Sequence, residues 1–358
     1  MNHLSFPAPV DDLHDAALAQ RLQQVIDNKT KPVGALGRLE ELALRIGLIL
    51  GTEAPVLEQP QMLVCAADHG LTARGVSAYP ADVTGQMVQN FLAGGAAVSV
   101  LARQHGIALT VVDCGVAREL VPQPGLLVRR LGAGTADASA GPAMSAAQCA
   151  EAIANGGEIV RALPGNALLL GEMGIGNSSV AALLLARLTM QDIDACTGAG
   201  TGLDAAGRAH KRAVLREVLA LHAQATAPLD ALAALGGFEI ATLVGAVLQA
   251  ARERRVIVVD GFIASAAVLV AHALEPAVVQ RCVAAHVSAE PGHALMLRAL
   301  GLMPLLQLDM RLGEGSGAAL AWPLLESACR ILREMASFES AGVSRKDDAP
   351  SLPEGTGA

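Results

Sequence analysis

Short, almost uninterrupted apolar runs alternate with longer stretches of helical periodicity, and this alternation limits the fold of the chain more than any other feature. The strand candidates are Met62–Ala66, Ala108–Val112, Ala167–Leu170, Val256–Val259, Val279–Ala284 and, more weakly, Leu126–Arg130. Strands that are apolar on both faces are typical of a parallel sheet covered by helices on each side. The helix candidates lie near 83–104, 144–162, 178–189, 207–223, 238–252, 262–274 and 316–335. The sequence therefore predicts an α/β fold with a mainly parallel sheet.

The two ends of the chain differ from this pattern. Ala16–Val25 and Leu36–Leu50 have the periodicity of amphipathic helices, with no strand between them. We therefore expect residues 1–50 to form a small helical subdomain, joined by the C-terminal helix 316–338, and residues 51–315 to form the large α/β domain with the active site. Beyond Phe338 the chain turns polar, with prolines and glycines, and we expect residues 339–358 to be a disordered tail.

Composition narrows the class of ligand. A net charge of −8 and an aromatic content of 2% argue against nucleic-acid binding, which leaves small molecules as the expected partners. The apolar runs are too short to span a membrane, and the N-terminus has no signal-peptide pattern. The six cysteines are scattered without a Cys-x-x-Cys pair, which favours a reduced, cytoplasmic setting and argues against a zinc site.

Polar residues follow five of the predicted strands at the point where each strand ends. They are Asp68-His69-Gly70, Asp113-Cys114-Gly115, Gly171-Glu172, Asp260-Gly261 and His286. Open α/β sheets bind ligands at the carboxyl ends of their strands. A single polar residue there is more often a cap or a turn residue, but five together predict a small-molecule active site.

One carboxylate, Glu314, stands between two glycines directly before an apolar helix candidate. Glycines on each side let the backbone adopt positive φ and approach a ligand closely. Two interpretations remain open from this segment alone: an acidic residue at the positive end of a helix, or a catalytic carboxylate.

Two glycine-rich turns are candidates for phosphate binding. Gly171–Ser179 follows a strand and opens a helix, so the helix N-terminus offers a natural anion site, although an ordinary β–α turn has the same pattern. Thr197–Asp204 is the second turn, and Lys211 on the following helix would supply a point charge, although such a lysine is more often simply solvated. The first turn does not match the dinucleotide fingerprint and lacks a Walker lysine.

Two rival functions follow from the same residues. A dinucleotide- or adenosylmethionine-dependent enzyme would use the same sheet, but the Gly174-Ile175-Gly176 spacing disfavours it. A sensor that binds a nucleotide or an azole without turnover would use Glu314 as a hydrogen-bond acceptor. The sequence also lacks metal-ligand spacing and the nucleophile elbow of serine hydrolases, so we expect no metal and no cofactor.

A set of ordered motif blocks resembles one known family, nicotinate-nucleotide–dimethylbenzimidazole phosphoribosyltransferase. The blocks are Lys31–Glu40, Ala67–Gly70, Gly75–Pro80, Asn90–Ala97, Gly171–Asn177, Leu235–Glu239, Val259–Phe262, His286–Glu290 and Arg311–Ala319. They run in order over about 28–338, nearly the whole folded length. Each block is only moderately specific, but the ordered set is highly specific.

The resemblance implies a Rossmann-like sheet, a homodimer and the transfer of phosphoribose from nicotinate mononucleotide to 5,6-dimethylbenzimidazole, giving α-ribazole 5′-phosphate and nicotinate in cobalamin biosynthesis. It implies that Glu314 is the general base and that Glu172 and Asp260 line the same pocket as further catalytic residues. The substrate-binding residues that it implies are Gly174, Ile175, Gly176, Asn177, Ser178, Lys211, Tyr79, Met87 and Leu312. Most of these come from the glycine-rich turn, with Lys211 for the phosphate and Tyr79 and Met87 for the benzimidazole.

The chain departs from the family pattern at a few positions. Ala35 stands where serine is common, and Ser178-Ser179 where paired threonines are common. Ala199 stands where many members carry arginine, and we expect this loss to weaken phosphate affinity.

Overall fold

The computed structural model describes residues 9–344, which fall into two compact units. The large unit comprises Leu57–Pro323 with residues 9–13, and the small unit comprises His14–Val56 with 324–344. Helix α13 (Ser316–Glu334) begins in the large unit and ends in the small one. These limits differ from the expected boundaries at 50/51 and 315/316, which stay predictions. Within the described residues, no helix has the length and apolar character needed to cross a membrane.

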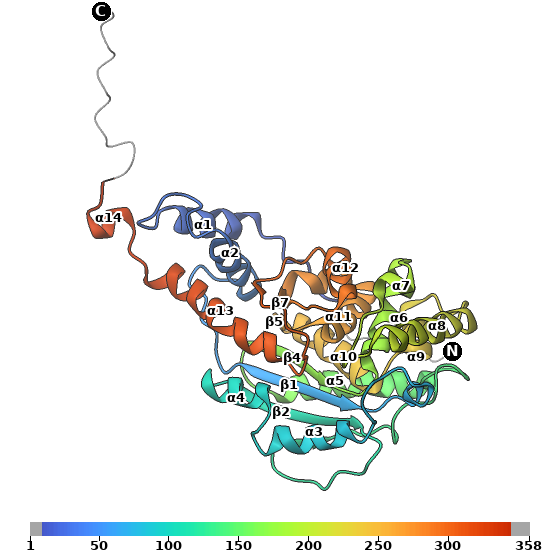
Figure 1. Ribbon diagram of the computed structural model, residues 1–358. Helices are drawn as coiled ribbons and strands as arrows, with labels where there is room; N and C mark the ends of the chain where they lie inside the picture. The colour runs from blue at the N-terminus through green and yellow to red at the C-terminus, as the bar shows by residue number, and fades with distance from the viewer. Residues whose placement is uncertain (1–8, 345–358) are drawn as a thin grey trace, which may run out of the picture. The chain divides into compact units, whose positions relative to one another are not determined.

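A six-stranded parallel sheet forms the centre of the large unit (Figure 1). In spatial order its strands are β3 (Leu126–Val128), β2 (Ala108–Gly115), β1 (Gln61–Ala67), β4 (Ala167–Met173), β5 (Val256–Val259) and β6 (Cys282–Ala284). This is the strand order of the Rossmann fold, in which the direction of chain progression reverses between β1 and β4. Every residue of β1 is buried, as expected for a central strand with helices on both faces. The predicted α/β fold with a Rossmann-like parallel sheet is confirmed.

Helices cover both faces of this sheet. On one face lie α5 (Ala146–Ala162), α10 (Phe238–Arg252) and α11 (Phe262–Leu274), and on the other lie α3 (Val83–Leu92) and α4 (Ala97–Gln104) (Figure 1). The remaining helical elements of the large unit are η1 (Gly70–Arg74), α6 (Asn177–Thr189), α7 (Ile193–Cys196), α8 (Ala205–Leu221), α9 (Pro228–Leu235), η2 (Pro276–Arg281) and α12 (Pro291–Leu300). Two short parallel strands, β7 (His286–Val287) and β8 (Leu306–Gln307), pair separately.

Two of the predicted elements are wrong in part. The single helix expected over 83–104 is two helices, because Gly94 takes a φ of +80° and ends the first one. The strand expected over Val279–Ala284 begins only at Cys282, because the residues from Pro276 onward form the 3₁₀ helix η2. Only the last three residues of that run pair with β5.

Close packing of α5 against α10 depends on two glycines. A Cβ added at Gly245 of α10 would lie 1.8 Å from the carbonyl oxygen of Ile153, and one added at Gly156 of α5 would lie 1.9 Å from that of Thr242. We expect Gly245→Ala to lower the free energy of unfolding by about 2 kcal/mol, because the helices must move apart. Urea unfolding checks this, with Gly141→Ala as the control, since a Cβ there would meet nothing within 4 Å. Equal stability of the two variants would contradict it.

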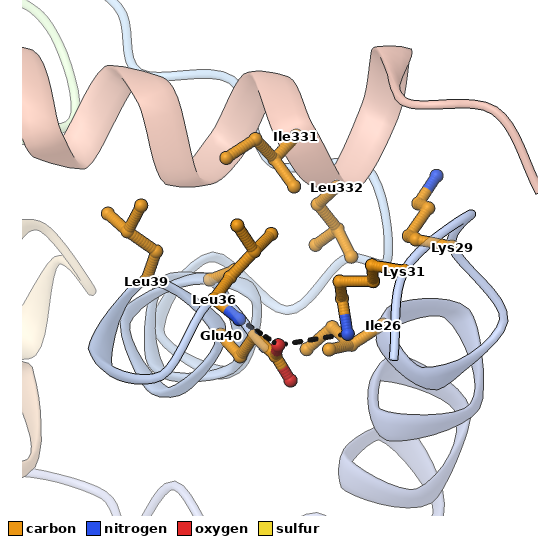
Figure 2. Close-up of a pocket in the computed structure, with 9 residues that line it drawn as sticks. Ile26, Lys29, Lys31, Leu36, Leu39, Glu40, Ile331 and Leu332 are labelled. Carbon is orange, nitrogen blue, oxygen red and sulfur yellow. Dashed lines mark hydrogen bonds and ion pairs between the residues drawn. The ribbon is translucent and has the colours of Figure 1, made fainter. Parts of the chain in front are cut away.

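The small unit contains α1 (Ala16–Asp27), α2 (Arg38–Leu50), the C-terminal part of α13 and α14 (Phe338–Ala341). Figure 2 shows Lys31 and Glu40 among apolar side chains of these helices, with their Nζ and Oε1 atoms 2.9 Å apart. We expected a disordered tail from residue 339 onward, but residues 339–341 form the end of α14. The part of that predicted tail from 345 to 358 lies outside the described residues.

Candidate active site

A cavity of about 400 Å³ opens in the large unit at the carboxyl end of β4, beside the point where the strand order reverses. Its lining residues are Tyr79, Val83, Met87, Glu172, Met173, Gly174, Ile175, Gly176, Asn177, Ser178, Gly200, Thr201, Ile263, Glu290, Arg311, Leu312 and Glu314. Ligands of open α/β sheets bind in this position. The volume is in the range of small-molecule sites.

The structure brings most of the expected site residues to this one cavity. Two of the expected catalytic carboxylates, Glu172 and Glu314, line it, and so do all the expected substrate-binding residues except Lys211. Lys211 and Asp260 lie behind the lining, where each contacts a segment that forms the wall. Asp260 is therefore placed to hold the wall and does not face the cavity.

Glu314 lies in a turn of unusual backbone conformation. Gly313, Glu314 and Gly315 have φ values of +80°, +67° and +91°. A non-glycine residue in this region costs about 1–3 kcal/mol, so the surrounding contacts must hold it there. The hydroxyl of Ser316 donates to the carbonyl of Gly313 at 2.7 Å, and the N–H of Gly315 donates to Asp260 at 3.1 Å. The glycines flanking Glu314 thus have the role that the sequence predicted.

Glu314 lines the cavity and is only 4% exposed, and its buried carboxyl oxygen Oε2 has no hydrogen-bond partner among the described residues. Burial and, to a smaller extent, the nearby Asp260 carboxylate raise the pKa of Glu314 to about 7, against the opposing effect of the backbone N–H of Val98. A carboxyl group with a pKa in this range exchanges a proton readily near neutral pH.

Asp260 supports the Glu314 turn from behind. Its two oxygens accept hydrogen bonds from the N–H of Gly315 at 3.1 Å and of Ala318 at 2.9 Å, at the start of α13. His286 Nε2 lies 3.7 Å from Asp260 Oδ1. Burial raises the pKa of Asp260, while His286 and the backbone N–H groups oppose the shift. Asp260 therefore acts on the cavity through the position of Glu314.

Glu172, at the end of β4, is the second carboxylate in the cavity. It accepts a hydrogen bond from the side-chain amide of Asn177. A Cβ added at Gly313 would lie 2.4 Å from Glu172 Oε1, so the Glu314 turn packs directly against this carboxylate. Burial, together with the charges of Asp260, Glu239 and Glu314, raises the pKa of Glu172 to about 8, and the hydrogen bond from Asn177 opposes this shift.

These raised pKa values predict how stability depends on pH. Glu172 and Glu314 bind a proton more tightly in the folded chain than in the unfolded chain, where the ordinary pKa is 4.5. Their contribution to stability is therefore fully present below about pH 4.5 and is lost as the pH rises through 7 and 8. We expect the free energy of unfolding of the ligand-free chain to fall by a few kcal/mol over this interval, since each unit of pKa shift corresponds to about 1.4 kcal/mol.

Urea unfolding at a series of pH values measures this dependence. Glu172→Gln is expected to flatten the dependence and to be more stable than the native chain at about pH 8, because the amide has no charge to bury. The same slope in both proteins would show that Glu172 is not the group that titrates.

The opposite end of the cavity has the features of an anion site. Gly176, with a φ of +95°, precedes the first turn of α6, whose positive dipole end faces the cavity wall. The ammonium group of Lys211 donates to the hydroxyl of Ser178 at 2.9 Å. Burial lowers the pKa of Lys211 to about 8, and the carboxylate of Glu290 opposes the shift. An anion beside Ser178 would therefore gain from both the helix end and the ammonium charge.

Two charged residues of this end were not predicted. Arg311 lines the cavity and donates to the carbonyl of Gly200 at 3.0 Å, beside Ala199. Glu290 is 6% exposed and its Oε2 has no partner among the described residues. Both residues belong to motif blocks that the family resemblance rests on, so the sequence marks them as candidates. Their role was missed because only the tertiary fold brings them to the glycine-rich turns.

The five polar strand ends have different roles. Glu172 reaches the cavity, and Asp260 with His286 supports the Glu314 turn. Asp68 accepts from the N–H of Ala117 at 2.7 Å, and Asp113 accepts from the N–H groups that follow it, so both carboxylates hold loops. The strand ends therefore mark the edge of the sheet where the cavity opens, but of their polar side chains only Glu172 lines it.

Comparison with known proteins gives matches over nearly the whole chain. A family model described as phosphoribosyltransferase matches residues 12–343. The nicotinate-nucleotide–dimethylbenzimidazole phosphoribosyltransferase of Variovorax paradoxus is 81% identical over 338 residues, which cover 94% of this chain and 97% of that protein. The protein of the same name from Cupriavidus necator is 58% identical, with 95% of this chain and 99% of that protein covered. The crystal structure of the corresponding enzyme from Thermus thermophilus matches with a TM-score of 0.89 at 42% identity, covering 93% of this chain and 100% of that chain.

Proposed function

The chain belongs to the nicotinate-nucleotide–dimethylbenzimidazole phosphoribosyltransferase family, and from this membership we propose how its cavity performs the transfer. The enzyme moves phosphoribose from nicotinate mononucleotide to 5,6-dimethylbenzimidazole and releases nicotinate and α-ribazole 5′-phosphate, a step of cobalamin biosynthesis. The observation that carries the proposal is that Glu314 lines the cavity from a turn of positive φ and has a buried carboxyl oxygen without a hydrogen-bond partner among the described residues.

Glu314 is the general base. The ring nitrogen of nicotinate mononucleotide is already cationic, so the bond to the ribose breaks without protonation of the leaving group. A benzimidazole nitrogen attacks the anomeric carbon, and the product stays cationic until its other N–H loses a proton. Glu314 accepts that proton, and its pKa of about 7 suits the transfer near neutral pH.

Glu172 faces the ribose. A carboxylate beside the anomeric carbon stabilises the positive charge that develops there as nicotinate departs. The side-chain amide of Asn177 holds this carboxylate in place. The apolar residues Tyr79, Met87 and Leu312 receive the flat benzimidazole ring on the other side of the cavity.

The phosphate binds at the first turn of α6. Lys211 and the hydroxyl of Ser178 form the polar corner of this site, and the helix dipole adds a favourable field. Holding the phosphate and the azole in one cavity orients the two reacting atoms, which supplies much of the rate enhancement. Asp260 takes part as a positioning residue, through its hydrogen bonds to the Glu314 turn.

The homodimer, the cytoplasmic location and the absence of a metal or cofactor are further parts of the proposal. They rest on the sequence resemblance and composition, and each has a simple test. Sedimentation measures the oligomeric state, and activity that persists in EDTA supports a reaction without a metal.

The stereochemistry of the product tests this mechanism. Direct attack by the azole on the β-nucleotide inverts the anomeric carbon, so NMR coupling constants of the product should show the α-anomer. A β-product would indicate two displacements through a covalent intermediate, with Glu172 as the nucleophile. If the chain binds either substrate and forms no product, it is a sensor that binds its ligand without turnover. If dinucleotides or adenosylmethionine raise its thermal stability, it is instead an enzyme that depends on one of these cofactors.

A further inference from the structure

A buried histidine–glutamate pair lies directly behind the phosphate-binding turn and takes no part in the proton transfer. His69 follows β1, and Glu239 stands in the first turn of α10. Their Nε2 and Oε1 atoms are 2.9 Å apart, and the side chains are 1% and 0% exposed. Burying two such groups is costly unless their charges are paired, so the pair needs an explanation at this position.

The shape of the surrounding backbone shows that the pair is built into the site. A Cβ added at Gly174, in the phosphate-binding turn, would lie 3.0 Å from His69 Nε2 and 2.5 Å from the carbonyl of Ala67. A Cβ added at Gly237 would lie 2.4 Å from His69 Cε1 and 2.5 Å from Glu239 Oε2. Both glycines therefore leave the space that the imidazole and the carboxylate occupy, and the imidazole edge contacts the turn itself.

The charges around the pair connect it to the cavity. Burial lowers the pKa of His69, but Glu239 and then Asp68 raise it, and the net effect is a pKa above the ordinary 6.5. Glu239 in turn raises the pKa of Glu172 and of the Cys65 thiol, which face it from β4 and β1. His69 is therefore paired with a carboxylate, Glu239, whose charge also acts on Glu172.

We propose that His69 and Glu239 form a charged positioning pair that supports Gly174 in the phosphate-binding turn and balances the charge next to Glu172. This inference rests on the proposed function, because it takes the Gly174–Ser178 turn as the site of the substrate phosphate.

The two partners are not equivalent under this proposal. Glu239→Gln removes the negative charge. Burial then favours the neutral form of His69, so the ring loses its proton and no unpaired charge is left near Glu172. His69→Gln leaves Glu239 as an unpaired buried carboxylate behind the turn. The single variants should therefore differ, and the double variant should resemble Glu239→Gln more than His69→Gln.

Long-range ¹H–¹⁵N spectra of the histidine rings test the charge directly in the ligand-free native chain. At about pH 6 we expect both ring nitrogens of His69 to carry protons, because its pKa lies above the ordinary 6.5, and the signal is assigned by its loss in His69→Gln. In Glu239→Gln the ring should be neutral at the same pH. A neutral His69 in the native chain would overturn the proposal.

A double-mutant cycle tests the coupling. His69→Gln should weaken the binding of nicotinate mononucleotide, measured by calorimetry, at least about tenfold, because the unpaired carboxylate repels the phosphate. The double variant should regain most of the affinity and of the urea stability. His222→Gln is the matched control, since this buried histidine pairs with the carbonyl of Ala138 at 2.8 Å, and Ala138 lies outside the cavity wall.

If the effects of the two substitutions on substrate affinity and on the free energy of unfolding are additive, the two side chains are not coupled and the proposal is overturned. Failure of the proposed function would look different, because the native chain would then release no nicotinate. The ring spectra and the stability cycle need no turnover, and they would still decide whether the pair is charged and coupled.

Discussion

Glu314→Gln is expected to lower kcat by about 10²- to 10⁴-fold, the range typical of losing a general base. The glutamine side chain has nearly the same shape and cannot accept the proton from the benzimidazole. The turn should persist, because Asp260 and Ser316 bind its backbone and not the Glu314 side chain. Steady-state kinetics measures the loss, and calorimetry should show little change in the affinity for nicotinate mononucleotide.

Glu158→Gln is the matched control, since Glu158 is an exposed carboxylate on α5 and does not line the cavity. Its kcat should equal that of the native chain. If Glu314→Gln retains full kcat with both substrates saturating, Glu314 is not the base, and Glu172 becomes the candidate.

Lys211→Met is expected to raise the KM for nicotinate mononucleotide by about 10- to 100-fold, with a smaller effect on kcat. The loss follows from removing a charge-assisted contact to the phosphate, which is worth about 1.5–3 kcal/mol. Lys211 is 1% exposed, so methionine fills the same buried space without an unpaired charge. Glu290, whose charge the ammonium group partly offsets, would then also repel the phosphate.

A substrate without the phosphate separates this effect from a general disturbance of the site. Nicotinate riboside should react at similar rates with the native chain and with Lys211→Met, because it has no phosphate for the ammonium group of Lys211 to bind. Arg208→Met, on the same helix and outside the cavity wall, serves as the control. A KM that rises equally for both substrates would contradict a phosphate-specific role.

Much of the fold is predictable because the strands and the buried helices are uniformly apolar. The bounds of α10 and α11 follow directly from such runs, and each begins after a glycine. Prediction fails where local backbone geometry overrides hydrophobicity. Gly94 ends a helix inside a continuous helical pattern, and Pro276 starts a 3₁₀ helix inside an apolar run.

The sequence predicts those parts of the candidate site that lie within one short motif. In Gly313-Glu314-Gly315, three consecutive residues reveal both the carboxylate and the glycines that allow the positive φ of this turn. The pair of His69 and Glu239 is 170 residues apart in sequence and needs the fold to bring it together. The same limit explains why Asp260 was expected in the cavity wall, since a strand end does not reveal which way its carboxylate points.

Nicotinate release from nicotinate mononucleotide, with and without 5,6-dimethylbenzimidazole, tests the central claim most directly. We predict that the native chain in EDTA releases nicotinate only when the azole is present, in a one-to-one ratio with α-ribazole 5′-phosphate. Release at the same rate without the azole would identify a hydrolase, and no release under either condition would contradict the proposed transfer.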